Sequence, residues 1–233
     1  MKGKLYLIPS PLGEYDPAEV LPAPVLRTAC SLRTFVVEEV RTARRFLSAA
    51  GLKGQIDTLE FHVLNEHTSQ QEVEALTVLF DKGDVGLISE AGLPAVADPG
   101  AALVALCHRE GIEVVPLVGP SSLMLALMAS GLNGQSFAFR GYLPAKTDER
   151  RSALKSIERD SKSLNQSQIF IETPYRNDAL LQDMLKFLQP STRLCVAADL
   201  TLPTAFVSTR TVAGWRRESV CIGKRPCVFI ILA

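Results

Sequence analysis

Short apolar runs, each followed by a segment of mixed polar and apolar residues, repeat along the first half of the chain. The runs carry few charges and are bounded by glycine, proline or acidic positions, a pattern typical of buried strands. We expect strands over 4–10, 33–40, 84–89 and 112–119.

Two helices are marked by their boundary residues. Asp98 is expected to cap a helix that begins at Pro99 and ends at Gly111, and Pro120 is expected to open a second helix that ends at Gly131. A strand, a helix and a strand in this order favour parallel pairing, with helices covering the sheet. The first half is therefore predicted to be an α/β domain with a parallel sheet.

The pattern changes in the second half. Residues 147–160 predict a charged amphipathic helix, 167–172 a strand, and 174–189 a helix that starts at its proline. Three further strands, joined as hairpins without helices between them, are expected over 193–200, 204–212 and 225–233. The predicted fold class is therefore α/β with two domains, a parallel-sheet domain over 1–118 and a mixed-sheet domain over 119–233.

Composition narrows the class of protein. Hydrophobic residues make up 47% of the 233 positions, no apolar stretch reaches the length of a membrane span, and no export signal is recognised, so a soluble cytoplasmic protein is expected. Basic and acidic residues number 25 each, which gives no overall attraction to nucleic acid. Five cysteines lie scattered without the paired spacing of metal or redox sites, so no metal is expected.

The charges are unevenly distributed along the chain. Residues 1–100 contain 9 basic and 14 acidic side chains, a net charge of −5, and the remaining residues contain 16 and 11, a net charge of +5. This asymmetry permits a second half that faces phosphate groups, although it does not require one.

Three loops leave the carboxyl ends of the expected parallel strands, where ligands bind in open α/β sheets. They cover 9–15, 89–100 and 118–122 and are rich in glycine, proline and other small residues. Each loop alone is explained by turn chemistry, but the three together indicate a binding site. The chain lacks the patterns GxGxxG and GxxxxGK[ST], which disfavours dinucleotides and nucleoside triphosphates. A rigid wall around Gly92 suits adenosine and a sulfonium instead.

Five motifs give the chain a family resemblance. LYLIPSPLG, VEEVR, LISEAGLPAVADPG, PLVGPSS and GYLPAK occur in this order and resemble the tetrapyrrole methylase superfamily of S-adenosylmethionine-dependent methyltransferases. The resemblance implies a homodimer with the cofactor S-adenosylmethionine in a cleft between the two domains, the acceptor side in the first domain and the second completing the cofactor site. The chain is most similar to members that 2′-O-methylate a cytidine of 16S rRNA, which implies 16S rRNA or the small ribosomal subunit as partner.

The resemblance assigns cofactor contacts by position. They fall on the three loops and on two strands of the second domain: Pro11, Leu12, Glu90, Ala91, Gly92, Leu93, Ser121, Ser122, Glu172, Thr173 and Pro226. Glu90 stands where the family usually has Asp, and Leu93 where Thr is common. Val40, Thr68 and Ser69 replace the usual Thr, Asn and Glu, so these departures fall on the acceptor side.

Four residues are candidates for chemistry at the acceptor: Glu38, Glu39, Arg41 and His67. Acids at the end of an apolar strand are poorly placed for stability alone. One interpretation is an ion pair with Arg41 or Arg44 at a helix start. The other is a carboxylate that binds or deprotonates the acceptor hydroxyl while Arg41 holds a phosphate. His67 is either a second candidate base or a loop histidine that only hydrogen-bonds its surroundings.

Cationic residues of the second domain are candidates for substrate binding. Lys146, Arg150 and Arg151 lie at the start of the helix expected over 147–160, where they either position an RNA backbone or form a solvated helix start. Trp215 either stacks on a base or belongs to the core or a dimer interface.

Three functional hypotheses follow from these observations. The first is a cytoplasmic methyltransferase that acts on a ribose of rRNA. The second keeps the same chemistry but takes a tetrapyrrole or another small molecule as methyl acceptor. The third is a non-catalytic protein that keeps the cofactor site as a binding scaffold.

Overall fold

The structure is a computed structural model that describes residues 2–233. The chain divides into two compact units, the first ending at Ser121 and the second comprising Ser122–Ala233. The boundary predicted from the sequence lies after residue 118, three residues earlier. Each unit contains its own five-stranded sheet and its own helices, so each is described separately.

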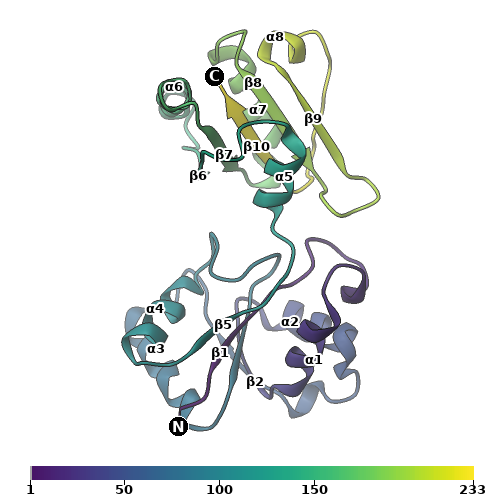
Figure 1. Cartoon of the computed structure of the whole chain (residues 1–233), viewed down its shortest axis with the longest axis vertical. Helices are drawn as coiled ribbons and strands as arrows, with labels where there is room; N and C mark the ends of the chain where they lie inside the picture. The colour runs from purple at the N-terminus through teal and green to yellow at the C-terminus, as the bar shows by residue number, and fades with distance from the viewer. Residues whose placement is uncertain (1) are drawn as a thin grey trace. The chain divides into compact units, whose positions relative to one another are not determined.

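The first unit is built on a parallel sheet with strand order β3-β2-β4-β1-β5 (Figure 1). Every neighbouring pair in it is parallel, as the strand and helix alternation predicted. The strands are β1 (Leu5–Ile8), β2 (Thr34–Val37), β3 (Glu60–Val63), β4 (Val85–Ile88) and β5 (Val114–Pro116).

Helices cover both faces of this sheet. Figure 1 shows α1 and α2 on one side of the strands and α3 and α4 on the other. Successive strand residues point to opposite faces, so Leu87 packs in the core beneath α3 and α4, whereas Ile88 packs in the core beneath α1 and α2. The helices are α1 (Ala23–Ser31), α2 (Val40–Leu47), α3 (Gln70–Ala75) and α4 (Ala101–Arg109).

The second unit has a mixed sheet with strand order β6-β7-β10-β8-β9. β6 and β7 are parallel, while β10 runs antiparallel to both of its neighbours and β8 and β9 form an antiparallel pair. The predicted mixed sheet is therefore confirmed. The strands are β6 (Phe137–Tyr142), β7 (Ser167–Ile171), β8 (Arg193–Ala198), β9 (Phe206–Thr211) and β10 (Cys227–Leu232).

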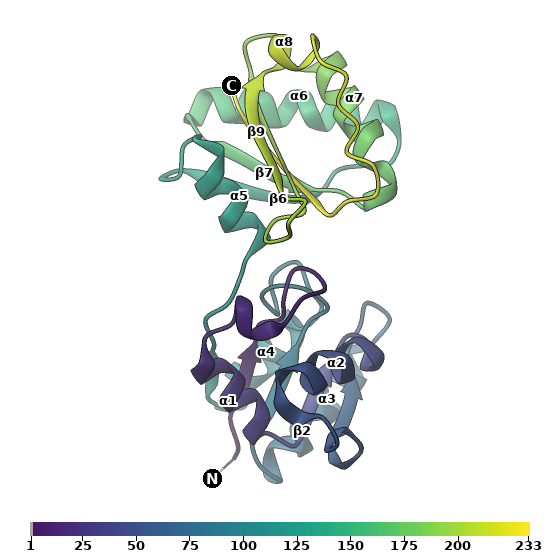
Figure 2. The same ribbon diagram turned by 90° about the vertical axis from the view of Figure 1, so that its right-hand side faces the viewer.

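The helices of the second unit also lie on both faces of its sheet. Phe229 packs in the core that includes residues of α6, α7 and α8, and Ile230 packs in the core that includes residues of α5. Figure 2 shows α5 apart from α6 and α7, with strands between them. The helices are α5 (Ser122–Ser130), α6 (Thr147–Leu164), α7 (Asn177–Phe187) and α8 (Val212–Trp215).

Several predictions of individual elements were wrong. The strands β3 and β6 were not predicted, and the short helix α8 separates β9 from β10, where only hairpins were expected. β10 pairs with β7 and β8 rather than with β9, because its six buried residues need a strand on each side. The predicted helix start at Pro174 is a 3-10 turn over Pro174–Arg176, and α7 itself begins after it.

Trp215 belongs to the core of the second unit. Its side chain is buried, its indole N–H donates to the Leu194 carbonyl at 2.8 Å, and its ring meets Phe206 edge to face. Of its two interpretations, the core position is therefore the one found. Within residues 2–233, no helix is both long enough and apolar enough to cross a membrane.

Candidate functional site

The loops after β1 and β4 are joined directly at the carboxyl edge of the first sheet. The Ser10 N–H donates to the Gly92 carbonyl at 2.9 Å, and the Gly92 N–H donates to the Ser10 carbonyl at 3.1 Å. The Ser10 hydroxyl also donates to the Ser89 carbonyl at 3.1 Å. β1 and β4 are neighbours whose following helices pack on opposite faces, so this is a topological switch point, where α/β sheets bind ligands.

Gly92 is the point at which the three expected loops meet. Its φ of +77° is one that side-chain-bearing residues rarely adopt, and a Cβ added there would lie 3.1 Å from Leu12 Cδ2 and 3.4 Å from the Pro120 carbonyl oxygen. The loops that carry Leu12, Leu93 and Ser121 therefore approach one another at a position that only a bare backbone fits well. This close approach is the geometry expected of a backbone wall around a small ligand.

The rest of the β4 loop holds a strained conformation. Ala95 and Ala97 have φ of 64° and 56°, in the left-handed region that costs a residue with a Cβ about 1–2 kcal/mol. Asp98 stabilises this loop, since its carboxylate accepts from the Ala95 N–H at 3.1 Å and from the Gly100 N–H at 2.7 Å. The predicted role of Asp98 as the helix cap was wrong, because its carboxylate closes the loop and α4 begins only after Gly100.

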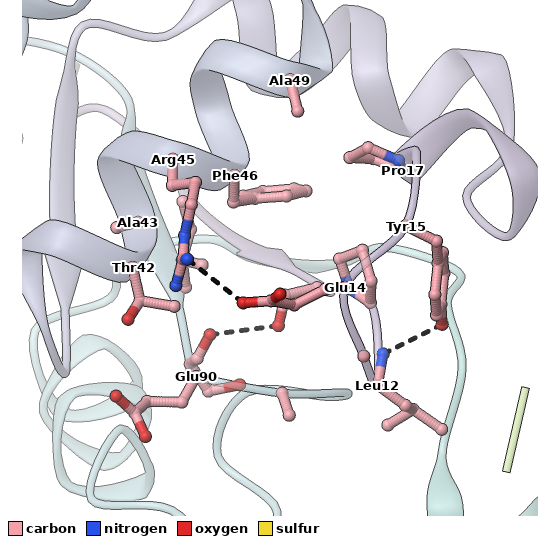
Figure 3. A pocket seen from close by; sticks show the side chains of 16 residues that line it. Leu12, Glu14, Tyr15, Pro17, Thr42, Ala43, Arg45, Phe46, Ala49 and Glu90 are labelled. Carbon is pink, nitrogen blue, oxygen red and sulfur yellow. Dashed lines mark hydrogen bonds and ion pairs between the residues drawn. The ribbon is translucent and has the colours of Figure 1, made fainter. Parts of the chain in front are cut away.

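A pocket of about 360 Å³ opens beside these loops (Figure 3). Its walls come from residues 10–17 after β1, from residues 42–49 of α2 and the following turn, and from residues 88–91 at the end of β4. In Figure 3 the Phe46 ring lies between Ala49 and Glu14. The lining is mainly apolar with a few polar groups, as is common for small-molecule pockets.

Two interactions fix the loop after β1 against this pocket. Arg45 Nη1 donates to Glu14 Oε1 at 3.1 Å, and both side chains are well exposed (Figure 3). The Leu12 N–H donates to the Tyr15 hydroxyl at 3.1 Å. Ser89 also lines the pocket, and its buried hydroxyl has no hydrogen-bond partner among residues 2–233.

Glu38 is a partly buried carboxylate at the carboxyl end of β2, beside the end of β4. Burial raises the pKa of the Glu38 carboxyl, and the negative charges of Asp98, Glu90 and Glu66 raise it further, against one backbone hydrogen bond at Glu90 that lowers it. A carboxylate whose pKa is raised is a stronger general base than an ordinary surface acid. Glu38 therefore has the properties expected of a base at this edge.

The adjacent Glu39 has a structural role. It is the N-cap of α2, and its carboxylate accepts from the Arg41 N–H at 3.0 Å. The Arg41 guanidinium has no acidic side chain within 4.0 Å in the described chain, so the ion pair offered as one interpretation of Glu38, Glu39 and Arg41 is not formed by Arg41. Its exposed cation is available to a phosphate.

His67 lies on an exposed turn with its side chain 84% accessible, and its nearest acid is Glu66 at 3.6 Å. The two residues that replace the usual family pattern after it are structural. The Thr68 hydroxyl accepts from the Asn65 N–H, and Ser69 begins α3 with a reciprocal capping box to Glu72.

Three assigned cofactor residues of the second unit lie at one edge of its sheet. Glu172 and Thr173 follow β7, and Pro226 precedes β10, which is paired with β7. The Glu172 carboxylate is buried: its Oε1 accepts from the Thr173 N–H at 2.6 Å and from Arg176, while its Oε2 has no partner among the described residues. Ser122, also assigned to the cofactor, is the first residue of α5.

The three candidate substrate-binding cations have different surroundings. Arg150 is buried; its guanidinium lies 2.5 Å from Asp183 and donates to the Pro144 and Ala145 carbonyls. It therefore holds the loop before α6, a role that sequence analysis did not foresee. The Arg151 guanidinium lies over the Phe187 ring, 5.4 Å from its centre. Lys146 is exposed and pairs with Glu149 at 3.3 Å.

The contribution of α2 and the turn after it to the pocket was not predicted. Thr42, Arg45 and Phe46 of α2 and Ala49 just after it are spaced as on any amphipathic helix, and only the fold brings them against residues 10–17. No group of three or more His, Cys, Asp or Glu side chains in residues 2–233 is arranged to hold a metal ion.

These features define a class of protein: a two-unit α/β chain with a candidate small-ligand site at the carboxyl edge of a parallel sheet. The family model Tetrapyrrole (Corrin/Porphyrin) Methylases matches residues 20–214. The chain belongs to this family, as the five motifs indicated.

Curated relatives of the chain share one protein name, ribosomal RNA small subunit methyltransferase I. The chain is 34% identical over 201 residues to the ribosomal RNA small subunit methyltransferase I of Escherichia coli O157:H7 and 36% identical over 198 residues to that of Vibrio cholerae. These matches cover 86% and 84% of the chain. They span 66% and 65% of the relatives, so the chain covers slightly less than two thirds of their length. The ribosomal RNA small subunit methyltransferase I of Haemophilus influenzae is 30% identical to the chain, with 93% of the chain and 72% of the relative covered.

Solved structures share the fold at low identity. The methyltransferase CobJ superposes with a TM-score of 0.66 at 14% identity, covering 99% of this chain and 94% of that one. A uroporphyrin-III C-methyltransferase from Thermus thermophilus, complexed with S-adenyl homocysteine, gives a TM-score of 0.56 at 18% identity, covering 99% and 97%. At these identities the comparison shows a common architecture.

Proposed function

We propose that the protein is an S-adenosylmethionine-dependent methyltransferase that methylates the ribose 2′-hydroxyl of a cytidine in 16S rRNA. The observation that carries the proposal is the meeting of three loops at Gly92, where an added Cβ would lie against Leu12 and the Pro120 carbonyl. Such a backbone cradle fits a ligand that is recognised by shape rather than by charge. Family membership and the names of the relatives support both the reaction and the substrate.

The resemblance assigns residues of both units to the cofactor. In the first unit they are Pro11, Leu12, Glu90 to Leu93 and Ser121, and in the second they are Ser122, Glu172, Thr173 and Pro226. When bound, S-adenosylmethionine supplies a methyl group that is already activated on a sulfonium. The chain then has two tasks, to align the acceptor oxygen with the donor and to accept the hydroxyl proton.

We assign the second task to Glu38. It lies at the carboxyl edge beside Glu90 and is partly buried, and burial and the neighbouring acids raise its pKa, which makes it a stronger base than an ordinary surface glutamate. Glu39 is occupied as the cap of α2, and His67 is exposed on a turn, so neither is as well placed. Arg41, Lys146 and Arg151 are the exposed cations proposed to contact RNA phosphates.

Two measurements test the proposal. Calorimetric titration with S-adenosylmethionine is expected to give one site per chain. Mass spectrometry of 16S rRNA from a strain without the gene is expected to show the loss of one ribose methyl group, restored by the gene. An unchanged ribose-methylation pattern would reject the rRNA substrate, and an absence of cofactor binding would reject the methyltransferase.

A tetrapyrrole acceptor is the alternative that the family description favours. It is tested by incubating the protein with S-adenosylmethionine and uroporphyrinogen III, and a methylated macrocycle would establish it. An rRNA substrate implies a cytoplasmic protein, and the resemblance implies a homodimer. Light scattering of the purified protein checks the second of these.

A further inference from the structure

The pocket between α2 and the loop after β1 is distinct from the Gly92 junction. Its lining includes Pro11, Leu12, Glu90 and Ala91, but it includes none of Gly92, Leu93, Pro120 and Ser121. Ser10 lines the pocket and exchanges two backbone hydrogen bonds with Gly92 of the junction. The same loops therefore present one surface to the junction and another to the pocket.

We propose that this pocket receives the nucleobase of the acceptor nucleotide, turned out of the RNA strand. The inference rests on the proposed function and adds a binding site to it. Enzymes that act on one nucleotide of a strand hold the extruded base against aromatic and apolar side chains and pair its polar edge with a few hydrogen-bonding groups.

The size and lining of the pocket fit one base. Its volume of about 360 Å³ lies near the lower end of the range of about 300–1,000 Å³ for ligand pockets, which is enough for a nucleobase but not for a tetrapyrrole macrocycle. Phe46 offers a flat ring, and Leu12 and Ala49 complete an apolar surface (Figure 3). Base stacking on an aromatic ring contributes about 1–3 kcal/mol.

Polar groups for the edge of a base are also present. The Ser89 hydroxyl is buried in the pocket lining without a partner in the described chain, a position that is costly unless something pairs with it. The Thr42 side chain lines the same pocket (Figure 3). A hydroxyl can donate or accept, so these groups suit the mixed donor and acceptor edge of a base.

The charges of α2 favour a nucleotide within a strand over the adenosine of the cofactor. α2 carries three arginines and no acidic residue. Arg44 pairs with Asp57, Arg45 pairs with Glu14 at the pocket, and Arg41 has no acidic partner within 4.0 Å among residues 2–233. A phosphodiester strand that places one base in the pocket can bring its phosphates to Arg41 and Arg45, whereas S-adenosylmethionine has no phosphate.

The test fills the pocket from its exposed side. Ala49 is exposed and lines the pocket, so Ala49→Trp occupies the space with little disturbance of the core, and Ala105→Trp on exposed α4 is the matched control. Binding of fluorescein-labelled octacytidylate, read by anisotropy, requires no methyl transfer. We expect Ala49→Trp to weaken this binding at least tenfold and Ala105→Trp to leave it unchanged. An abasic octamer of the same length should bind both variants and the unmodified protein equally.

Titration with S-adenosylhomocysteine completes the test. The expected affinity of Ala49→Trp for it is within twofold of the unmodified protein, and a tenfold loss would assign the pocket to the cofactor and overturn the inference. Unchanged octacytidylate binding in Ala49→Trp would overturn it as well. If the tryptophan prevents folding, as judged by circular dichroism, Ala49→Leu takes its place with the same criteria. If the unmodified protein does not methylate rRNA, only the proposed function is rejected, because the anisotropy measurement requires no methyl transfer.

Discussion

Ser10 and Gly92 exchange two backbone hydrogen bonds, of 2.9 and 3.1 Å, and so join the loops that follow the neighbouring strands β1 and β4. These bonds involve only main-chain atoms, and they fix the carboxyl edge of the first sheet independently of the side chains at either position. Gly92 then contributes the bare backbone that Leu12 and Pro120 approach. The cofactor assignment depends on this arrangement, and its first test is made at Gly92.

Gly92→Val is expected to reduce the affinity for S-adenosylmethionine at least tenfold, about 1.4 kcal/mol, because the new side chain meets Leu12 and the Pro120 carbonyl. Calorimetry measures the effect. Gly111→Val is the matched control, since Gly111 also has a positive φ, +65°, but nothing lies within 4 Å of an added Cβ. Equal affinities in the two variants would show that strain alone, and not the loop contact, is responsible.

Glu38→Gln is expected to lower kcat for rRNA methylation by about 10²–10⁴-fold, the usual contribution of a general base, while cofactor affinity is retained. Glu39→Gln keeps an oxygen that can cap α2 and is expected to change kcat less than threefold. The two neighbouring carboxylates are thus separated by single-turnover rates. A slow Glu39→Gln enzyme beside an active Glu38→Gln enzyme would reverse the assignment.

The same substitution is expected to affect stability with a definite sign. The pKa of Glu38 is raised in the folded protein by burial and by Asp98, Glu90 and Glu66, so between the unfolded and folded pKa values the folded state binds more protons. The free energy of unfolding therefore falls as the pH rises through this interval. Glu38→Gln should raise Tm at pH 7, and the gain should disappear below the usual glutamate pKa of 4.5. A gain that persists at pH 4 would point to a cause other than charge.

Ser69→Ala is expected to destabilise the protein by about 1 kcal/mol, because the capping box between Ser69 and Glu72 is lost at the start of α3. Urea denaturation measures the change in the free energy of unfolding. Ser31→Ala, at the exposed end of α1, removes a serine that caps no helix start and should stay within about 0.5 kcal/mol of the unmodified protein. Comparable losses in both variants would argue against the capping role.

Arg150→Ala is expected to cost about 3 kcal/mol or more of stability, because it leaves the largely buried Asp183 carboxylate without its partner. Arg151→Ala removes only a contact over the Phe187 ring and should cost less than about 1 kcal/mol. Thermal unfolding of the two variants separates them. A stable Arg150→Ala protein with impaired RNA binding would restore Arg150 as a substrate-binding residue.

Much of the architecture could be predicted because short apolar runs indicate individual strands without reference to the rest of the fold. The apolar runs at β1, β2 and β4 form the interior strands of the first sheet and are wholly or partly buried along their length, so their composition indicates parallel strands. The edge strand β5 has no fully buried residue, but its run of apolar residues marks it as well. β3 and β6 escaped prediction because their sequences mix polar or glycine positions with the apolar ones and none of their residues is fully buried, as in EFHV of β3 and FAFRGY of β6. The sequence pattern of such a strand resembles that of a loop.

The candidate site was predictable only in part, for a related reason. The three loops were expected to converge because parallel strands end at a common edge, and glycine and proline mark the backbone there. The roles of individual acids were not readable, since Glu38 and Glu39 are chemically identical and differ only in burial and in the N–H group that each accepts. The pocket lining of α2 likewise depends on which helix face the fold turns inward.

The position of β10 determines when the second unit can complete its fold during synthesis. Among residues 2–233 β10 follows the other strands, yet it lies in the middle of the second sheet, with all six of its residues buried between β7 and β8. During synthesis the first unit has all its strands before Cys227–Leu232 leave the ribosome, while the second is still two separate strand pairs. Its core closes only after translation has passed Leu232, so a ribosome stalled shortly before that point would carry one finished unit and one open to proteolysis.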